Sequence, residues 1–238
     1  MTNSLTIVHL YPTVLGLYGD RGNAMILADR ARRRGILAEV VNVDPGAPVP
    51  DSADIYLLGG GEDLAQITAT ELLAADGGLA RAAARGAPVI AVCAGMQILG
   101  SSFWAGGREV AGLGLLDVTT GPGSTRAVGE LVADSLDLTI PRLTGYENHG
   151  GRTRLGLGVR PLARVVQGVG NGAGDGTEGA VAGHIIGTYL HGPALARNPA
   201  LADVLLTWAT NESLAPLADD TADALRRERL TALGAVEA

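Results

Sequence analysis

The sequence contains no lysine, and all 18 of its basic residues are arginine. This absence excludes a P-loop of the G-x-x-x-x-G-K-[ST] pattern, a Schiff-base lysine and the ATP-binding lysine of a protein kinase. If the reaction of this protein consumes ATP, we therefore expect another chain to bind it.

Cysteine and positive charge are also scarce. The single cysteine, Cys93, excludes an internal disulfide framework and a C-x-x-C redox or zinc motif. The formal net charge is -7 and the pI about 5.0. These values argue against general nucleic-acid binding, which requires a basic surface. With 47% hydrophobic and 18% charged residues, the 238-residue chain can bury a large core.

No charged residue occurs between Arg85 and Arg108, a stretch long enough to raise the question of a membrane span. Pro88, Gln97 and several serines and glycines interrupt this stretch, which fits a buried strand followed by a helix better. The N-terminus lacks the basic segment and apolar run of a signal peptide. We therefore expect a soluble, cytoplasmic protein without membrane insertion.

The first half of the sequence alternates between apolar, β-branched runs and alanine-rich segments, which predict strands and helices. Strands separated by helices pair in parallel, and helices then cover both faces of the sheet. The sequence therefore predicts an α/β fold with a mostly parallel central sheet. The predicted strands are 5–10, 37–43, 55–58 and 89–92; one predicted helix ends at Arg34, before Gly35, and another spans 64–85 with a possible break at 77–78.

The second half is richer in glycine, and its apolar runs are shorter. We interpret the runs at 110–118, 129–138, 159–169 and 181–189 as a mixed or antiparallel extension of the same sheet. Residues 198–210 and 221–233 predict C-terminal helices. No internal repeat or linker composition occurs, so we expect residues 1–238 to form one domain.

Cys93 directly follows a predicted strand and precedes a predicted helix, which makes it the first candidate for chemistry. A residue at such a sharp turn lies at the carboxyl end of the sheet, where α/β proteins bind their ligands. Backbone N–H groups at the start of the helix, beginning with Ala94, can stabilise a thiolate and then an oxyanion. A lone cysteine is more often a buried structural residue, however.

Two other segments follow predicted strands and could complete such a site. His191 comes after the run 181–189 and could supply the base that a thiol nucleophile needs. Gly60 lies in a run of three glycines, where a backbone N–H can approach a ligand closely. Taken singly, a lone histidine is usually structural, and three glycines also form a flexible turn. Because no G-x-G-x-x-G motif occurs there, a dinucleotide site is not expected.

The remaining histidines give weaker signals. His9 and His184 lie in predicted strands, and we expect His184 in the core. His149 lies in the polar segment ENHGG at 147–151, which is either a structural turn or part of a site. No group of His, Cys, Asp and Glu residues has metal-ligand spacing, so no metal is expected in this chain.

Together these motifs resemble those of the class I glutamine amidotransferases, in particular the cobyric-acid-synthase-like branch. The sequence CAGMQ at 93–97 is similar to the C-x-G-x-Q elbow of that family, in which the cysteine attacks the side-chain amide of glutamine and releases ammonia. The resemblance covers residues 5–199 and implies the family's α/β fold. Its other motifs are LYGDRGN at 17–23, GGGED at 59–63, GYENHGGRT at 145–153, the glycine-rich segment 172–180 and GTYLHGP at 187–193.

Within this branch the chain is most similar to stand-alone glutaminase subunits that work with a Mur-ligase-like partner, MurT. The resemblance implies a heterodimer in which the partner binds ATP, Mg²⁺ and lipid II and amidates the α-carboxyl of D-glutamate in lipid II. This chain would hydrolyse L-glutamine, pass ammonia to the partner and carry no cofactor itself. The absence of lysine agrees with this division of labour.

The resemblance also assigns roles to individual residues. An arginine suits the α-carboxylate of glutamine because the guanidinium offers paired donors, whereas otherwise it would be a solvated surface residue. Triad members of the family carry a glutamate two residues after the histidine, where this sequence has Pro193, so a third acid would come from the partner. The implied roles are Cys93 as nucleophile, His191 as general base, and Gly60, Ala94, Gln97 and Arg126 as the residues that bind glutamine or its oxyanion.

Three alternatives stay open. An amidotransferase for a corrinoid or another carboxylate would use the same chemistry, although such proteins usually carry a fused ATP-binding domain. A PfpI-like cysteine hydrolase has a similar elbow but needs neither Gln97 nor Arg126. A non-enzymatic binding module would have an unreactive cysteine, whereas a reactive one is expected to have a depressed pKa.

Overall fold

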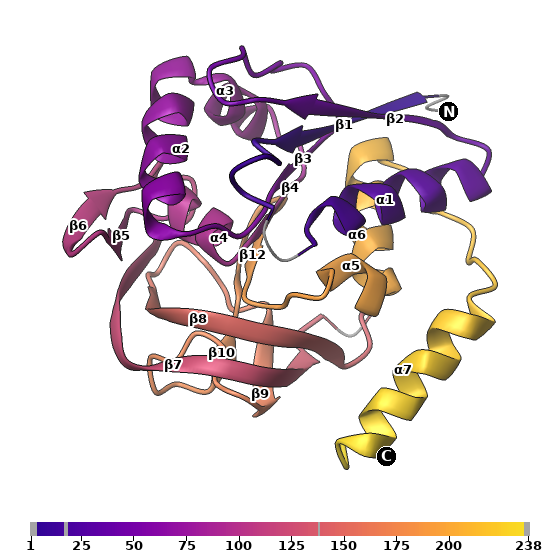
Figure 1. The fold of residues 1–238 in the computed structure, drawn as a ribbon. Coiled ribbons are helices and arrows are strands. Elements are labelled where there is room, and N and C mark those ends of the chain that lie inside the picture. Colours follow the sequence, from indigo (N-terminus) through magenta and orange to yellow (C-terminus); the bar gives the residue numbers. More distant parts are fainter. Residues whose placement is uncertain (1–3, 17–18, 138, 236–238) are drawn as a thin grey trace.

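Six strands form the first of two sheets in the computed structural model, which describes residues 4–16, 19–137 and 139–235 (Figure 1). The strand order is β11–β12–β4–β3–β1–β2, and every neighbouring pair except β11 and β12 is parallel. The strands are β1 (Ser4–Leu10), β2 (Leu37–Val43), β3 (Ile55–Leu58), β4 (Val89–Val92), β11 (Ala180–Ala182) and β12 (Ile185–Thr188).

The central strands of this sheet owe their position to short, continuous apolar runs. Every residue of β3 and of β4 is buried, as expected for a parallel strand covered on both faces. Strand β2, at the edge, is exposed or half-buried at every position except its last, Val43. The four strands that the sequence predicts in the first half and the mostly parallel sheet are confirmed, and β11 supplies an antiparallel edge.

Helices cover both faces of this sheet (Figure 1). α2 and α3 lie on one face, and α1 and α6 lie on the other. The predicted break at residues 77–78 is confirmed, since Gly77 has a φ of 70° and separates α2 from α3. The helices are α1 (Arg21–Arg33), α2 (Asp63–Asp76), α3 (Gly78–Ala84), α4 (Ala94–Leu99), α5 (Ala194–Arg197), α6 (Pro199–Thr210) and α7 (Asp220–Ala232).

A second, mixed sheet packs below the first in the view of Figure 1. Its centre is the long antiparallel hairpin of β7 and β8, whose register runs from Val118 opposite Leu155 to Ala133 opposite Leu143. Strand β5 pairs with β7 in parallel and with β6 in antiparallel orientation. The strands are β5 (Ser102–Ala105), β6 (Arg108–Ala111), β7 (Val118–Ser135), β8 (Leu143–Leu155), β9 (Ala163–Gln167) and β10 (Thr177–Glu178).

This second sheet corrects the interpretation of the second half of the sequence. The runs at 110–118, 129–138 and 159–169 do not extend the first sheet; only the run at 181–189 does so, through β11 and β12. The physical reason is the β7–β8 hairpin, because these two long strands pair along one edge of β7 and leave its other edge to pair with β5 and β9.

His184 is a second correction. It lies in the turn between β11 and β12 and is exposed, not in a strand within the core. Its ring stacks on Trp208 with 4.9 Å between the ring centroids, and its Nδ1 lies 2.8 Å from the carbonyl oxygen of Gly86. His9 is buried in β1, as the sequence predicts.

The C-terminal helix α7 connects the two sheets. At its start, Asp219 pairs with Arg30 of α1, which packs against the first sheet. Near its end, Leu230 joins a small apolar cluster with Val132 of β7 in the second sheet. Both predicted C-terminal helices are confirmed. Within the described ranges, no helix combines the length and the apolar character that a membrane crossing requires.

Candidate active site

Cys93 forms a tight elbow between β4 and α4. Its backbone angles, φ 54° and ψ −110°, lie outside the regions that non-glycine residues prefer. The Cys93 N–H donates to the carbonyl oxygen of Thr188, 2.8 Å away at the end of β12. At Gly95, a Cβ would lie 2.9 Å from the carbonyl oxygen of Leu58, so a side chain would push the elbow away from β3. The predicted strand-to-helix turn is therefore present.

The thiol borders a cavity of about 200 Å³ between the two sheets. Cys93, Ala94 and Gln97 line it from the elbow, and the β7–β8 hairpin closes the opposite side with Arg126 and residues 148–151. Four of the six candidate residues from the sequence thus meet at one cavity. The other two, Gly60 and His191, do not line it.

The environment of Cys93 favours the neutral thiol. Burial raises the pKa of Cys93 to about 12, although the Ala94 N–H and the charge of Arg126 act in the opposite direction. Negative charge from Asp20 adds to the increase. The depressed pKa expected of a reactive cysteine is therefore not a property of the thiol in this structure, and a base is needed to remove its proton.

His191, the candidate base from the sequence, lies at the same edge of the sheet as Cys93. Strands β4 and β12 are neighbours with Val92 opposite Thr188, so Cys93 and His191 both follow the carboxyl ends of adjacent strands. Backbone hydrogen bonds in both directions join His191 to Tyr146 of β8. Burial and the charge of His149 lower the pKa of His191 to about 4. The imidazole is therefore neutral at pH 7, the form that accepts a proton.

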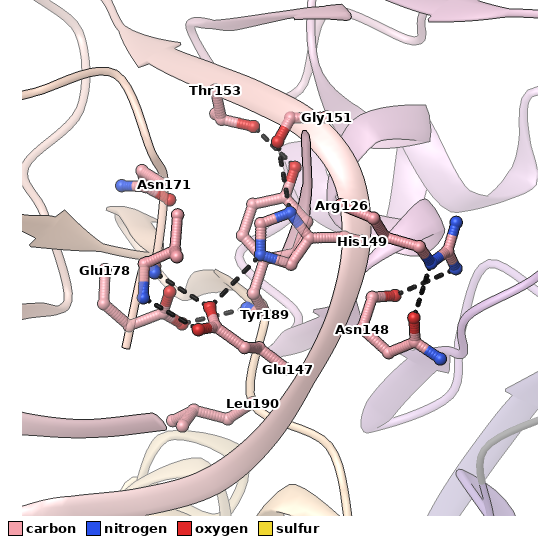
Figure 2. A network of polar contacts seen from close by, with 12 residues as sticks. Arg126, Glu147, Asn148, His149, Gly151, Thr153, Asn171, Glu178, Tyr189 and Leu190 are labelled. Carbon is pink, nitrogen blue, oxygen red and sulfur yellow. Dashed lines mark hydrogen bonds and ion pairs between the residues drawn. The ribbon is translucent and has the colours of Figure 1, made fainter. Parts of the chain in front are cut away.

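His149, in the wall of the cavity, forms a buried pair with Glu147 (Figure 2). The Nε2 of His149 lies 3.3 Å from Oε2 of Glu147, and its Nδ1 lies 3.1 Å from the carbonyl oxygen of Gly151. Each ring nitrogen therefore faces an acceptor oxygen. The ring also stacks on Tyr189 with 3.7 Å between centroids and 17° between planes. The segment 147–151 is therefore part of a strand beside the site, not a turn.

Gln97 is held at both ends of its side-chain amide. Its Oε1 accepts a hydrogen bond from Gln66, and its Nε2 donates to the hydroxyl of Tyr189, each at 2.9 Å. The same hydroxyl lies 2.8 Å from Oγ1 of Thr153, which in turn lies 2.7 Å from Oγ1 of Thr120. This buried chain of hydrogen bonds joins the elbow of the first sheet to the hairpin of the second.

Arg126 is oriented by its neighbour on β8, as Figure 2 shows. Its Nε donates to Oδ1 of Asn148 over 2.6 Å, and one terminal nitrogen makes a longer bond to the backbone oxygen of the same residue. Both residues line the cavity. A guanidinium held in this way keeps its remaining donors for a carboxylate in the cavity.

Gly60 and Glu178 complete the surroundings of the site. The Gly60 N–H donates to Oδ2 of the buried Asp20 over 2.8 Å, so in this structure it serves a contact within the chain. Glu178 accepts hydrogen bonds from the hydroxyl of Thr188 and the N–H of Tyr189, just before His191. Burial raises the pKa of Glu178 to about 7. Among the described residues, no three His, Cys, Asp or Glu side chains gather in a way that could hold a metal ion.

Sequence reasoning thus found the elbow and part of the cavity, but it missed Asp20, Asn148 and Tyr189. All three lie within motifs that the sequence singled out, LYGDRGN, GYENHGGRT and GTYLHGP, so their place in those motifs was the available signal. Their contacts join residues from 22 to 92 positions apart, which no local pattern reveals.

A sheltered thiol, a neutral imidazole at the same sheet edge, backbone N–H groups and an arginine suit acyl transfer from a small substrate with a carboxylate. Comparisons with known proteins agree. The CobB/CobQ-like glutamine amidotransferase domain family matches residues 6–199. The chain is 39% identical over 210 residues to the lipid II isoglutaminyl synthase (glutamine-hydrolyzing) subunit GatD of Staphylococcus aureus (strain N315), with 87% of this chain and 85% of that protein covered.

Other relatives are similar over different shares of their length. GatD of Streptococcus pneumoniae (strain ATCC BAA-255 / R6) is 34% identical over 86% of this chain and 80% of its own. A cobyric acid synthase of Pelotomaculum thermopropionicum is 40% identical over 70% of this chain, but only 34% of that protein is covered.

Among solved structures, a crystal structure of a glutamine amidotransferase matches with a TM-score of 0.58 and 22% identity over 85% of this chain and 98% of its own. The PurLQS structure from Thermotoga maritima also has a TM-score of 0.58, at 18% identity over 89% and 99% of the two chains. At such identities these matches support the fold alone. The resemblance found in the motifs is confirmed, and the chain belongs to the CobB/CobQ-like family of glutamine amidotransferase domains.

Proposed function

We propose that this protein is the glutaminase subunit of a lipid II isoglutaminyl synthase. The observation that carries the proposal is the cavity at the Cys93 elbow, lined by Arg126, in a chain that matches two GatD proteins over at least 80% of their length. The cavity is of a size for a small amino acid, and Arg126 is available for the α-carboxylate of L-glutamine.

In the proposed reaction, the sulfur of Cys93 attacks the side-chain carbonyl carbon of glutamine while His191 takes the thiol proton. Backbone N–H groups of Ala94 and of the glycine run at residues 59–61 stabilise the negative oxygen of the tetrahedral intermediate. The intermediate collapses, and ammonia leaves with a proton from His191, which yields a thioester on Cys93. Water then attacks this thioester with His191 as base, and glutamate leaves with the thiol restored.

The ammonia would pass to a Mur-ligase-like partner, MurT, in a heterodimer. We propose that the partner binds ATP, Mg²⁺ and lipid II and forms D-isoglutamine from the α-carboxyl of D-glutamate in the cytoplasm. The name of the relatives supports this step, since both are subunits of a glutamine-hydrolysing lipid II isoglutaminyl synthase. The partner could also contribute the third acid that Pro193 does not provide in this chain.

The decisive experiment measures glutamate and ammonia release from L-glutamine by this chain, alone and with its Mur-ligase-like partner. The Cys93→Ala and His191→Ala variants are expected to lose the release, and the partner is expected to increase it in the wild type. Release that persists in the Cys93→Ala variant would contradict the proposed nucleophile. Absence of release from the wild type, with Cys93 reduced and the partner present, would refute the glutaminase itself.

A second acceptor deserves a parallel assay because cobyric acid synthases are also relatives, at 34–40% identity. The complex is therefore offered lipid II or a corrinoid carboxylate together with ATP and glutamine. Amidation of lipid II alone is the expected result. Amidation of the corrinoid instead would reassign the acceptor and leave the glutaminase chemistry unchanged.

A further inference from the structure

Asp20 is a buried carboxylate that does not cap the helix at whose start it lies. It is the N-cap residue of α1, where an aspartate normally accepts hydrogen bonds from the first turn of its own helix. Here its side chain makes no such cap, and only 2% of the residue is exposed. A buried carboxylate that does not bond to its own helix is expected to have another hydrogen-bond partner.

The carboxylate reaches instead to the glycine loop, residues 59–61, which follows β3. Its Oδ2 accepts the Gly60 N–H over 2.8 Å. At Gly59, a Cβ would lie 2.6 Å from the same oxygen and 2.1 Å from the backbone oxygen of Leu15, so the loop backbone lies directly on Asp20. The other oxygen, Oδ1, is buried without a hydrogen-bond partner among the residues that the structure describes.

The glycine loop also contacts the Cys93 elbow. At Gly95, a Cβ would lie 3.1 Å from the carbonyl oxygen of Gly59, so α4 and the loop pack backbone against backbone. Gly61, the last residue of the loop, lines the cavity beside Cys93 and Ala94. The glycine loop thus contacts Asp20 on one side and the Cys93 elbow on the other.

On this geometry, and on the proposed glutaminase function, we propose that Asp20 is a positioning residue for the oxyanion hole. Its carboxylate holds Gly60 by the backbone N–H, which fixes the next peptide, at Gly61, in the cavity wall. Since the Gly60 N–H is occupied, the Gly61 N–H is the loop's donor to the oxyanion, together with that of Ala94. The position of the donors before reaction decides how much they stabilise the intermediate.

The charge of Asp20 has a separate consequence that allows the two effects to be distinguished. Burial raises the pKa of Asp20 to about 6, so the group is mainly ionised at pH 7.5. Its negative charge is one of the causes that raise the pKa of Cys93. Asp20→Asn removes the charge but keeps an acceptor for Gly60, whereas Asp20→Ala removes both.

The first test is glutaminase kinetics of the complex with the Mur-ligase-like partner. Asp20→Ala is expected to lower kcat at least about 10-fold with KM changed less than about 3-fold, since one lost oxyanion donor costs about 100- to 1,000-fold. Asp20→Asn is expected to keep kcat within about 3-fold of the wild type, because the acceptor remains. Alkylation of Cys93 by iodoacetamide, which uses no oxyanion hole, is expected to continue in both variants.

The second test does not depend on turnover. Hydrogen exchange of the Gly60 amide in the full chain is expected to become at least about 10-fold faster in Asp20→Ala and to stay near the wild-type rate in Asp20→Asn. Asp54→Ala is the matched control. Asp54 directly precedes β3 and accepts the backbone N–H of Thr6 over 2.7 Å, at the amino ends of the strands and away from the glycine loop. This variant should accelerate exchange at Thr6 and leave Gly60 and kcat unchanged.

Each other outcome overturns the proposal. An Asp20→Ala variant with the exchange of Gly60 unchanged would show that the carboxylate does not hold the loop. A kcat equal to or above that of the wild type would show that the contact does not help the reaction. Loss of activity in Asp20→Asn equal to that in Asp20→Ala would assign the effect to charge. If the wild-type complex releases no glutamate, the proposed function fails, and hydrogen exchange still shows whether Asp20 holds the glycine loop.

Discussion

Cys93 combines a strained backbone with an unreactive ground state. The elbow exposes the sulfur to the cavity, but only 6% of the residue is accessible, and burial holds the proton on the thiol. His191, with a pKa lowered to about 4, is a weak base in the same surroundings. Proton transfer between the two is therefore unfavourable in the chain as it stands, and ligands or a partner that change this environment would control turnover.

The reactivity of Cys93 in the chain without its partner gives a direct measure of this state. Because burial favours the neutral form, the thiolate fraction rises with pH, and alkylation by iodoacetamide should increase roughly tenfold per pH unit from pH 7 to 10. Mass spectrometry of the modified chain gives the rates. The guanidinium-unfolded chain is the control, and its rate should level off above about pH 9. A folded-state rate that is already constant at pH 7 would contradict this prediction.

Glu178 should make stability depend on pH in a recognisable direction. Its folded-state pKa is raised to about 7 by burial, above the value of 4.5 for a free carboxyl. Protonation therefore favours the folded state: this contribution is complete below pH 4.5 and is lost as the pH rises through 7. Between pH 5 and 8.5, the free energy of unfolding of the wild type should fall by up to about 3 kcal/mol relative to Glu178→Gln.

Urea unfolding at both pH values measures this difference. Glu71→Gln, a substitution of an exposed glutamate on α2, is the control and should follow the wild type. A difference between wild type and Glu178→Gln that is the same at pH 5 and pH 8.5 would mean that Glu178 does not titrate in this range.

At the residue scale, sequence reasoning identified the groups that local patterns mark. Cys93 and Ala94 follow from the strand-to-helix turn, whereas Gln97 and Arg126 follow from the family resemblance. It could not assign contacts made by tertiary pairing. The hydrogen bond from Gly60 to Asp20 and that from Arg126 to Asn148 join separate segments, so their existence depends on the register of strands.

Elements differ in how far their neighbours can be read from the sequence. Strands β1 to β4 are short apolar runs, and a helix follows each of β1, β3 and β4. Consecutive strands connected in this way usually lie next to each other, or close together, in one parallel sheet. Strand β7 instead contains glycines, a proline and a register shift between Pro122 and Ala127. This composition hides the alternation that marks a half-buried strand, and so the second sheet was not predicted as a separate unit.

The attachment of α7 depends on Arg30 of α1. Its guanidinium makes two bonds to Asp203, at 2.7 and 2.6 Å, and one to Asp219 at 2.6 Å, and only 5% of the residue is exposed. Removal of one partner from such a cluster leaves buried charge behind. We expect Arg30→Ala to lower the free energy of unfolding by about 3 kcal/mol and to accelerate hydrogen exchange throughout α7.

Arg32→Ala is the matched control, because Arg32 is an exposed arginine on the same helix that bonds to the backbone oxygen of Ala38. This variant should change the free energy of unfolding by less than about 1 kcal/mol. Equal effects of the two substitutions would show that the buried cluster does not hold the helix.

On the scale of the whole molecule, the site exists only where the two sheets meet. The first sheet supplies the elbow and the second supplies Arg126 and the wall at 148–151. The hydroxyl of Tyr189 connects them, because it bonds to Gln97 on one side and to Thr153 on the other. Substrate binding should therefore depend on this one buried hydroxyl, although it does not line the cavity.

Tyr189→Phe tests this dependence. It leaves the buried Nε2 of Gln97 without its acceptor, so we expect the free energy of unfolding to fall by about 1–3 kcal/mol and KM for glutamine to rise several-fold. Tyr56→Phe is the control, since the Tyr56 hydroxyl accepts the N–H of Ala53 far from the cavity. It should lower stability similarly without a change in KM. A raised KM in both variants would attribute the effect to general destabilisation.

The size of the cavity limits which glutamine can be the source of the ammonia. A volume of about 200 Å³ lies below the range of about 300–1,000 Å³ for drug-sized ligands, and the role proposed for Arg126 requires a free α-carboxylate rather than a peptide bond. Glutamine residues inside proteins are then not substrates, and the cell's own polypeptides are spared deamidation. The rate of amidation would then follow the concentration of free glutamine. A cell that is short of nitrogen would amidate less, without removing amide groups from its own proteins.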